Sequence, residues 1–292
     1  MRMIYRYFVQ INLALVMLAG CASIPATPHI ARVVVFGDSN VDNGNLYRLT
    51  GQKYPAAPRW QGRESDGPVV VEYLASNLHA TLQDYAVSGA TTGVSNIVEH
   101  KLTAAAGTGM MRQLDDFFQS GAQLKESDLV VIWAGSNDIF EVRREDRNAL
   151  NTGIATATAN LEKAVDRLAA QGAGHIIVAN RSPRPAIGSD NDLNGTELNA
   201  AIDKTVRMLR ETRHSDIMLY DDYAAISDMV KNPSRYGFSE VNELCIKVPA
   251  CAEQNVDTNM TIADTYINWD GAHKTTRVHR LMADQIQQLL VK

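Results

Sequence analysis

The chain has 292 residues, of which 45% are hydrophobic and 21% are charged, and it carries a formal net charge of −5 at pH 7. This composition supports one α/β core and excludes a largely disordered chain. The acidic balance argues against nucleic acid as a partner, because Lys and Arg side chains supply most of the affinity for nucleic acid.

The first twenty residues have the pattern of a secretory signal peptide. Arg2 and Arg6 precede an apolar run over 11–18, which is too short to span a bilayer comfortably. The run ends in Leu-Ala-Gly-Cys, which resembles the lipobox of bacterial lipoproteins, where the cysteine carries the lipid. An ordinary cleaved signal with an incidental Cys21 remains the alternative.

This N-terminus predicts an exported protein that is anchored to a membrane through lipid on Cys21, at the outer membrane or the periplasmic face. The expected parts are a signal peptide at 1–20, a lipidated spacer at 21–30 and a single domain at 31–292. Export also means an oxidising compartment, in which Cys245 and Cys251 are expected to form a disulfide. Free thiols or a metal site are the alternatives, but no histidine lies near the pair in the sequence.

Apolar, β-branched runs alternate with helix-period segments along the rest of the chain. This alternation predicts an α/β fold, namely a flavodoxin-like three-layer α/β/α sandwich with a central parallel sheet. The expected strands are 32–36, 128–133, 175–179 and 216–220, with a weaker one at 82–87. Helices are expected to end at Gly172, to cover 198–209 and to follow His273, whereas 180–195 reads as a loop and 233–268 as an irregular, disulfide-pinned segment.

The first chemical signal is Gly-Asp-Ser at 37–39, directly after a buried strand. Open α/β sheets place their ligands at the carboxyl ends of their strands, which makes Ser39 a candidate nucleophile. By itself the tripeptide is more often a turn with a helix-capping residue.

The second signal, Asp270-Gly-Ala-His273, lies near the other end of the chain. A serine hydroxyl needs a base to take its proton, and a histidine base works best when a carboxylate fixes its tautomer. A separation of three residues in a turn allows Asp270 to reach Nδ1 while Nε2 faces outward. His279 is the only other reasonable base, but no acidic residue precedes it at a comparable range, and Asp-x-x-His alone is also a common helix start.

Two further turns follow strands and offer hydrogen-bond donors. Gly89 lacks a Cβ, so its backbone N–H can approach a ligand closely, and Asn137 in Gly-Ser-Asn-Asp carries a carboxamide. Ester attack places negative charge on the carbonyl oxygen, which such donors stabilise. Each turn alone is ordinary turn chemistry.

Taken together, the order Gly-Asp-Ser, Gly, Gly-x-Asn-Asp and Asp-x-x-His resembles the GDSL or SGNH hydrolase superfamily over nearly all of the mature chain. Segments 36–45 and 269–275 resemble its lecithinase, thermolabile-haemolysin and plant-type branch. The resemblance implies Ser39 as nucleophile, His273 as base and Asp270 as its partner. It also implies an oxyanion hole made by the Ser39 N–H, Gly89 and Asn137, and site-shaping roles for Asp38 and Asp42.

Two residues depart from the family pattern: Asn40 replaces the leucine that names the family, and Lys274 stands where proline is usual. Neither makes or breaks bonds in the implied mechanism, so the departures concern substrate preference and loop geometry rather than catalysis.

These features predict an exported serine esterase that hydrolyses carboxylic esters, with acyl lipids or phospholipids as the expected substrates and no metal or organic cofactor. An acyltransferase and a glycan O-deacetylase are alternatives, because another alcohol can resolve the same acyl-enzyme. A non-catalytic binding lipoprotein is a third. The fourth alternative is a metal phosphohydrolase whose ligands would be Asp38, Asp42, Asp138 and Asp270. The lack of suitably spaced histidine ligands argues against it.

Overall fold

The computed structural model describes residues 28–184, 189–253 and 262–291. Five parallel strands form its main sheet in the order β2-β1-β3-β4-β5, which is the flavodoxin-like order. The strands are β1 (Arg32–Gly37), β2 (Thr81–Asp84), β3 (Asp128–Trp133), β4 (His175–Ala179) and β5 (Asp216–Tyr220). The predicted signal peptide and Cys21 lie outside the described residues.

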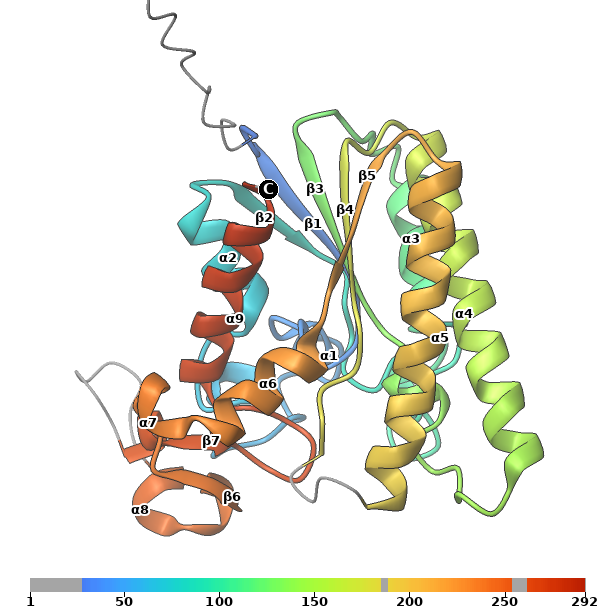
Figure 1. The fold of residues 1–292 in the computed structure, drawn as a ribbon. Coiled ribbons are helices and arrows are strands. Elements are labelled where there is room, and N and C mark those ends of the chain that lie inside the picture. The colour runs from blue at the N-terminus through green and yellow to red at the C-terminus, as the bar shows by residue number, and fades with distance from the viewer. Residues whose placement is uncertain (1–27, 185–188, 254–261, 292) are drawn as a thin grey trace, which may run out of the picture.

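Helices cover both faces of this sheet, which confirms the predicted three-layer α/β/α sandwich (Figure 1). Successive side chains of a strand point to opposite faces, so Val33 and Val35 pack into one core while Val34 and Phe36 pack into the other. The first core is covered by α2 (Val70–Asn77), α6 (Asp222–Lys231) and α9 (Thr276–Leu289), and the second by α3 (Met110–Gln119), α4 (Arg147–Ala170) and α5 (Asp190–Thr212).

Two sequence-based boundaries are wrong. The weaker strand is β2 at the sheet edge, and it ends at Asp84, whose carboxylate accepts hydrogen bonds from the Ala86 and Asn43 amides. The expected loop over 180–195 gives way to α5 at Asp190, because the Ser189 side chain caps the helix by accepting from the Asp192 amide. Ser, Asp and Asn favour loops and helix caps alike, so composition did not separate the two.

Residues 233–253 and 262–275, here called the base-side lobe, contain short elements where an irregular segment was expected. Its β6 (Glu240–Leu244) and β7 (Tyr266–Asn268) pair in parallel, and its short helices are α7 (Pro233–Tyr236) and α8 (Pro249–Ala252). Elements of three to five residues are too short to show a period in the sequence.

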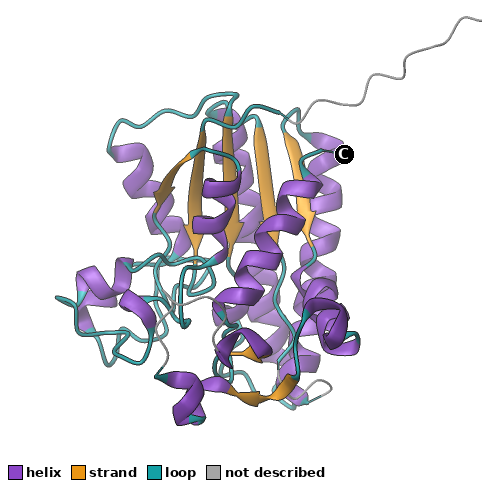
Figure 2. Ribbon diagram, turned by 90° about the vertical axis from the view of Figure 1, so that its left-hand side faces the viewer, coloured by secondary structure: helices purple, strands orange, loops and turns teal. Residues whose placement is uncertain are grey.

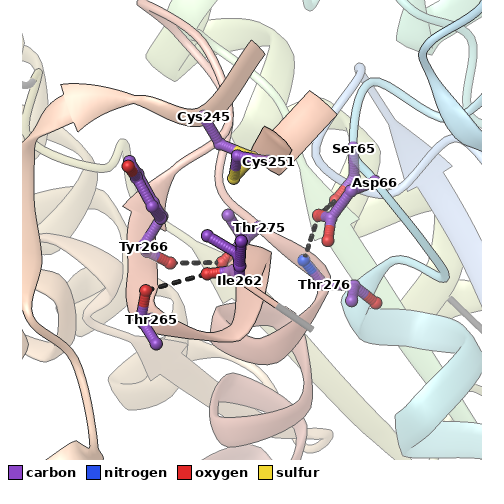
Figure 3. The surroundings of a disulfide bond; sticks show 9 residues. All are labelled: Ser65, Asp66, Cys245, Cys251, Ile262, Thr265, Tyr266, Thr275 and Thr276. Carbon is purple, nitrogen blue, oxygen red and sulfur yellow. Dashed lines mark hydrogen bonds between the residues drawn. A yellow bond between two sulfur atoms is a disulfide. The ribbon is translucent and has the colours of Figure 1, made fainter. Parts of the chain in front are cut away.

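A disulfide joins Cys245 and Cys251 inside the base-side lobe (Figure 3). Both cysteines are buried in one cluster with Trp269. The lobe is tied to the rest of the fold where the Ser65 hydroxyl donates a hydrogen bond of 2.9 Å to the Lys274 carbonyl. Directly after the lobe, the Thr276 amide at the start of α9 donates to the Asp66 carboxylate at 2.8 Å (Figure 3). The junction between the lobe and α9 is therefore held by two neighbouring residues, Ser65 and Asp66.

Loops gather beyond the carboxyl ends of the sheet strands (Figure 2). This is the end at which open parallel α/β sheets bind their ligands. The helix α1 (Asn45–Leu49) lies in this region, directly after the loop that leaves β1. None of the helices that the structure describes is both long and apolar enough to cross a membrane.

Candidate active site

The loop after β1 places Ser39 just beyond the carboxyl end of that strand. A Cβ at Gly37 would lie 2.2 Å from the Trp133 carbonyl oxygen on β3, so the close approach of the two strands requires glycine. Asp38 then donates its amide to the same carbonyl at 2.9 Å, and its Oδ1 accepts from the Asn40 amide and side chain at 3.0 and 2.8 Å. Burial raises the pKa of Asp38 to about 6, although the Asn40 bonds oppose the shift.

Asp42 holds two loops of the site together. Its fully buried carboxylate accepts hydrogen bonds from four backbone amides. Three belong to its own loop, Gly44, Asn45 and Leu46, at 2.8, 2.5 and 3.2 Å, and the fourth is Ser88 at 2.7 Å. One side chain thus joins the serine loop to the loop that carries Gly89.

Three N–H donors line the same cavity as the serine hydroxyl. Within the described residues, the Ser39 and Gly89 amides have no acceptor, and both residues line the cavity. Gly89 has φ +84°, and a Cβ there would lie 2.4 Å from Asn96 Oδ1, so only glycine fits. Asn137 donates one Nδ2 hydrogen to the Ala90 carbonyl at 2.9 Å, which leaves the second hydrogen of the amide for a ligand.

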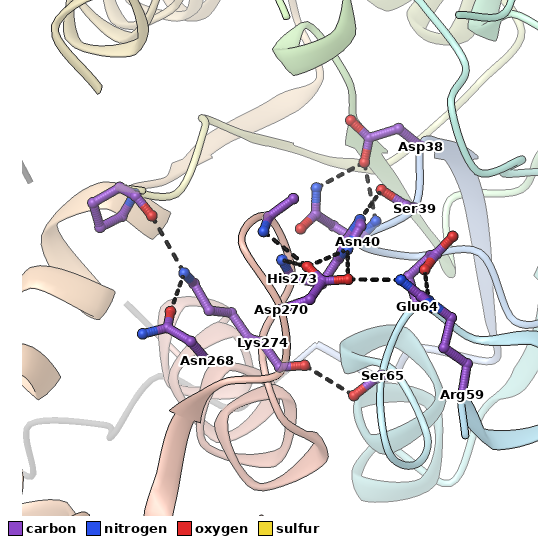
Figure 4. A network of polar contacts seen from close by, with 12 residues as sticks. Asp38, Ser39, Asn40, Arg59, Glu64, Ser65, Asn268, Asp270, His273 and Lys274 are labelled. Atoms are coloured by element: carbon purple, nitrogen blue, oxygen red, sulfur yellow. Dashed lines mark hydrogen bonds and ion pairs between the residues drawn. The ribbon is translucent and has the colours of Figure 1, made fainter. Parts of the chain in front are cut away.

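The base-side lobe brings Asp270 and His273 to the serine across 234 positions of sequence (Figure 4). His273 Nε2 lies 2.9 Å from Ser39 Oγ, and its Nδ1 lies 2.9 and 3.0 Å from the two Asp270 oxygens. The Ala272 and His273 amides also donate to Asp270 Oδ1, at 2.8 and 2.9 Å. The three residues expected from the sequence are therefore assembled in one place, with the imidazole between a hydroxyl and a carboxylate.

The charges of this group support proton transfer to the imidazole. Burial by itself would lower the pKa of His273. The charge and the hydrogen bond of Asp270 raise it by more than burial lowers it, so the net pKa lies above its usual range. Burial likewise would raise the pKa of Asp270, but His273 and the two amides hold it well below the usual range. At neutral pH the carboxylate is ionised and stabilises a protonated imidazole.

His279, the other histidine considered from the sequence, is buried in α9. Its Nδ1 has no hydrogen-bond partner in the described part of the chain, and burial lowers its pKa to about 3. It is a neutral packing residue.

Sequence reasoning missed Arg59 and Glu64. Arg59 Nη2 donates to Asp270 Oδ2 at 3.0 Å, and its Nε donates to Glu64, so the guanidinium bridges the two carboxylates (Figure 4). The contact spans 211 positions, and the segment around Arg59 has neither a periodic pattern nor a family motif that would have marked it.

Lys274, which was expected only to alter loop geometry or substrate preference, makes specific contacts with its side chain. It is 2% exposed, and its Nζ donates to Asn268 Oδ1 at 3.0 Å and to the Pro183 carbonyl at 3.3 Å. Burial lowers its pKa to about 8, against the attraction of Asp222. The side chain thus joins the base loop to the segment that follows β4.

A cavity of about 200 Å³ opens over the serine and the imidazole. One group of lining residues is apolar or aromatic: Leu46, Tyr54, Ile97, Val98 and Phe140. Another carries charge: Asp38, Glu64, Arg181 and Arg184. The cavity therefore offers a ligand both apolar contacts and charged groups of either sign.

The four acids considered for a metal site do not cluster. Asp138 accepts from the Thr92 amide and hydroxyl at 2.9 and 2.5 Å, while Asp38 and Asp42 bind the donors described above. Across 28–184, 189–253 and 262–291, the one group of acidic and histidine side chains close enough to share an ion is Glu64, Asp270 and His273. Arg59 already donates to both carboxylates of that group, which makes it a poor cation site.

A flavodoxin-like sheet whose first strand leads to a serine, with a histidine and an aspartate brought to that serine from another loop, is an arrangement of serine hydrolases. The family described as GDSL-like lipase/acylhydrolase matches residues 33–286, and the chain belongs to this family.

Curated relatives extend the comparison. The chain is 25% identical over 280 residues to the thermolabile hemolysin of Vibrio parahaemolyticus, covering 88% of this chain and 63% of the hemolysin. It is 24% identical to the phosphatidylcholine-sterol acyltransferase of Aeromonas hydrophila, covering 75% of this chain and 66% of that protein. A GDSL esterase/lipase of Arabidopsis thaliana is 22% identical, covering 93% and 95%. The chain thus spans just under two thirds of the first two relatives.

Solved structures share the fold. A lipolytic protein of the G-D-S-L family from Veillonella parvula superposes with a TM-score of 0.51 at 14% identity, covering 89% of this chain and 97% of that one. Axe2, an acetylxylan esterase from Geobacillus stearothermophilus, gives 0.51 at 15% identity, covering 90% and 96%.

Proposed function

We propose that the protein hydrolyses carboxylic esters through an acyl-enzyme on Ser39. The observation that carries the proposal is the continuous chain of contacts from Ser39 Oγ to His273 Nε2 and from Nδ1 to Asp270, all between 2.9 and 3.0 Å. His273 takes the proton as Oγ attacks the acyl carbonyl, and it returns the proton to the leaving alcohol. Water then repeats the sequence on the acyl-enzyme and releases the acid.

The oxyanion of each tetrahedral intermediate is held by the Ser39 and Gly89 amides and the Asn137 carboxamide. One such donor contributes roughly 2.7 to 4 kcal/mol to the transition state in enzymes of this kind. The Asp42 carboxylate supports the hole indirectly, because it fixes the two loops that carry the amides.

Acyl lipids, including phospholipids, are the proposed substrates. The support is the apolar part of the cavity, with Leu46, Ile97 and Val98, which suits an acyl chain. The name of one relative, a phosphatidylcholine-sterol acyltransferase, agrees with a lipid substrate.

A p-nitrophenyl ester series of increasing acyl length tests the enzyme. Ser39→Ala is expected to abolish turnover while leaving the thermal midpoint unchanged. Ser136→Ala is the matched control, since Ser136 lines the same cavity, and it should retain activity. Turnover by Ser39→Ala at the native rate would contradict the proposal, as would inhibition by a chelator that added metal reverses.

Acyl transfer is a second candidate, favoured by the similarity to an acyltransferase. Hydrolysis and transfer differ only in the second nucleophile, water or another alcohol. Product analysis on phospholipid with and without a sterol separates them: free fatty acid in both samples indicates hydrolysis, and a sterol ester in the second indicates transfer.

We also propose that the protein is exported and anchored through lipid on Cys21. The support is the sequence of the first 21 residues. Cys21→Ser should move the protein from the membrane fraction to the soluble one. Unchanged membrane retention of this variant would remove the anchor from the proposal.

A further inference from the structure

The segment after β4 brings two arginines into the wall of the cavity that holds Ser39 and His273. Arg181 is 4% exposed, and a Cβ at Gly195 would lie 1.9 Å from its Nη1, so its guanidinium packs closely against α5. Arg184 is less buried. The two residues thus differ: Arg181 is packed into the protein, whereas Arg184 is accessible from the cavity.

Arg184 has hydrogen-bonding capacity that the protein leaves unused. Its guanidinium carbon lies 5.4 Å from the centre of the Phe140 ring, which holds it by a cation–π contact. Its buried Nε has no hydrogen-bond partner among the described residues. A guanidinium carries five N–H donors in a planar fork that matches phosphate and carboxylate groups.

The acidic residues of the same cavity are already bonded to other donors. Asp38 Oδ1 accepts from Asn40, and Glu64 accepts from Arg59. Burial lowers the pKa of Arg184, while the charges of Asp38 and Asp270 oppose the shift, and the group stays protonated at neutral pH. Among the described residues the Arg184 guanidinium forms no ion pair, so a charged side chain without a carboxylate partner lines the substrate cavity.

The chemistry of the lining residues indicates which part of an ester contacts Arg184. An acyl chain suits the apolar side chains Leu46, Ile97 and Val98, whereas a charged group on the alcohol suits the charged side chains of the lining. Arg181 lies in the same cavity wall, and two guanidinium groups attract a doubly charged phosphate more strongly than a singly charged carboxylate.

We propose that Arg184 binds a phosphate group on the alcohol part of the ester substrate. This inference rests on the proposed ester hydrolysis and narrows the substrates to acyl esters of phosphorylated alcohols. Arg184 acts in substrate binding and specificity and takes no part in bond making at Ser39.

The test compares two esters with the same acyl chain, 1-hexanoylglycerol 3-phosphate and 1-hexanoylglycerol, below the concentrations at which they aggregate. Arg184→Gln is expected to lower kcat/KM at least tenfold for the phosphorylated ester and less than threefold for the neutral one. The matched control is Arg207→Gln on α5, whose side chain is 65% exposed, and it should change neither. Rates are taken on the plateau of the pH profile, because the Arg184 charge lowers the pKa of His273.

Inhibition gives a second, independent measurement. Glycerol 3-phosphate should inhibit hydrolysis of the neutral ester competitively, and at least tenfold more weakly in Arg184→Gln. Arg184→Lys, which keeps the charge but loses the fork, should fall between the two proteins and serves if the glutamine variant is unstable.

Equal losses on both esters, or a native enzyme that does not prefer the phosphorylated one, would overturn the inference about Arg184. Ser39→Ala separates this outcome from failure of the proposed function. If that variant loses turnover of both esters, ester hydrolysis stands whether or not Arg184 recognises phosphate.

Discussion

The two halves of the site are held in place by different means. The serine loop leaves a strand in the middle of the sheet, and the Asp42 carboxylate accepts from three amides of this loop and from the Ser88 amide of the Gly89 loop. The base loop leaves a two-stranded lobe and is held by two of its own amides on Asp270 and by Arg59, a side chain from a distant part of the chain. One buried carboxylate within its own loop fixes the hydroxyl, whereas the imidazole also depends on a long-range side-chain contact.

The largest expected effect on rate comes from Asp270→Asn, which removes the carboxylate that hydrogen-bonds to His273. Asparagine keeps the shape but favours the wrong imidazole tautomer, and kcat should fall by about three to four powers of ten. The thermal midpoint and kcat on p-nitrophenyl butyrate are measured together. Asp216→Asn is the matched control, because this exposed carboxylate also contacts a histidine, His175, at 3.1 Å. A loss below tenfold in Asp270→Asn would show that His273 needs no carboxylate partner.

Asp42→Ala breaks the serine half and should act on stability and activity together. Four buried amides lose their acceptor, and the free energy of unfolding should fall by about 3 kcal/mol. Urea unfolding measures the change, and Asp42→Asn, which keeps one acceptor oxygen, should fall between the two proteins. A stability loss in Asp42→Ala no larger than in Asp216→Asn would remove Asp42 from its structural role.

Removing the disulfide tests whether the positions of Asp270 and His273 depend on the stability of the base-side lobe. Replacing both Cys245 and Cys251 by serine opens a loop with a sequence separation of 6, and stability should fall by about 2 kcal/mol on loop-entropy grounds. Below the unfolding transition, kcat/KM should stay within threefold of native, because the contacts of Asp270 and His273 with each other remain. A much larger loss of activity in the folded variant would mean that the disulfide positions the base directly.

Arg59→Met should have the smallest effect in free energy, about 1.4 kcal/mol of positioning energy, which corresponds to a loss of about tenfold in kcat/KM. Arg59→Lys should recover part of the rate. The pH profile gives a readout that a purely structural role would not move. The base must be neutral, so activity is lost as the pH falls through the pKa of His273.

Because the pKa of His273 is raised in the native protein, the acid limb of the pH–activity profile should lie above the ordinary histidine value of about 6.5. Removing the Arg59 cation leaves the Asp270 and Glu64 charges less compensated, which stabilises the protonated imidazole and should shift the limb to still higher pH. An unmoved limb together with a tenfold rate loss would assign Arg59 to packing alone.

The sequence alone determined the sheet and the identity of the reacting side chains. Strands β1, β3, β4 and β5 were predictable because strands buried on both faces are continuous apolar runs. Ser39, Asp270 and His273 were recognisable because each belongs to a local motif with its own turn chemistry. Asp42 was also anticipated from its motif, although its four amide contacts were not.

Tertiary structure alone decided which distant residues support those motifs. Arg59 reaches Asp270 across 211 positions, and Lys274 reaches Pro183 across 91. Arg184 lines the cavity only because the segment after β4 turns toward the serine. Such contacts depend on how elements pack, and an isolated charged residue in an aperiodic segment carries no local signal of the partner that it will meet.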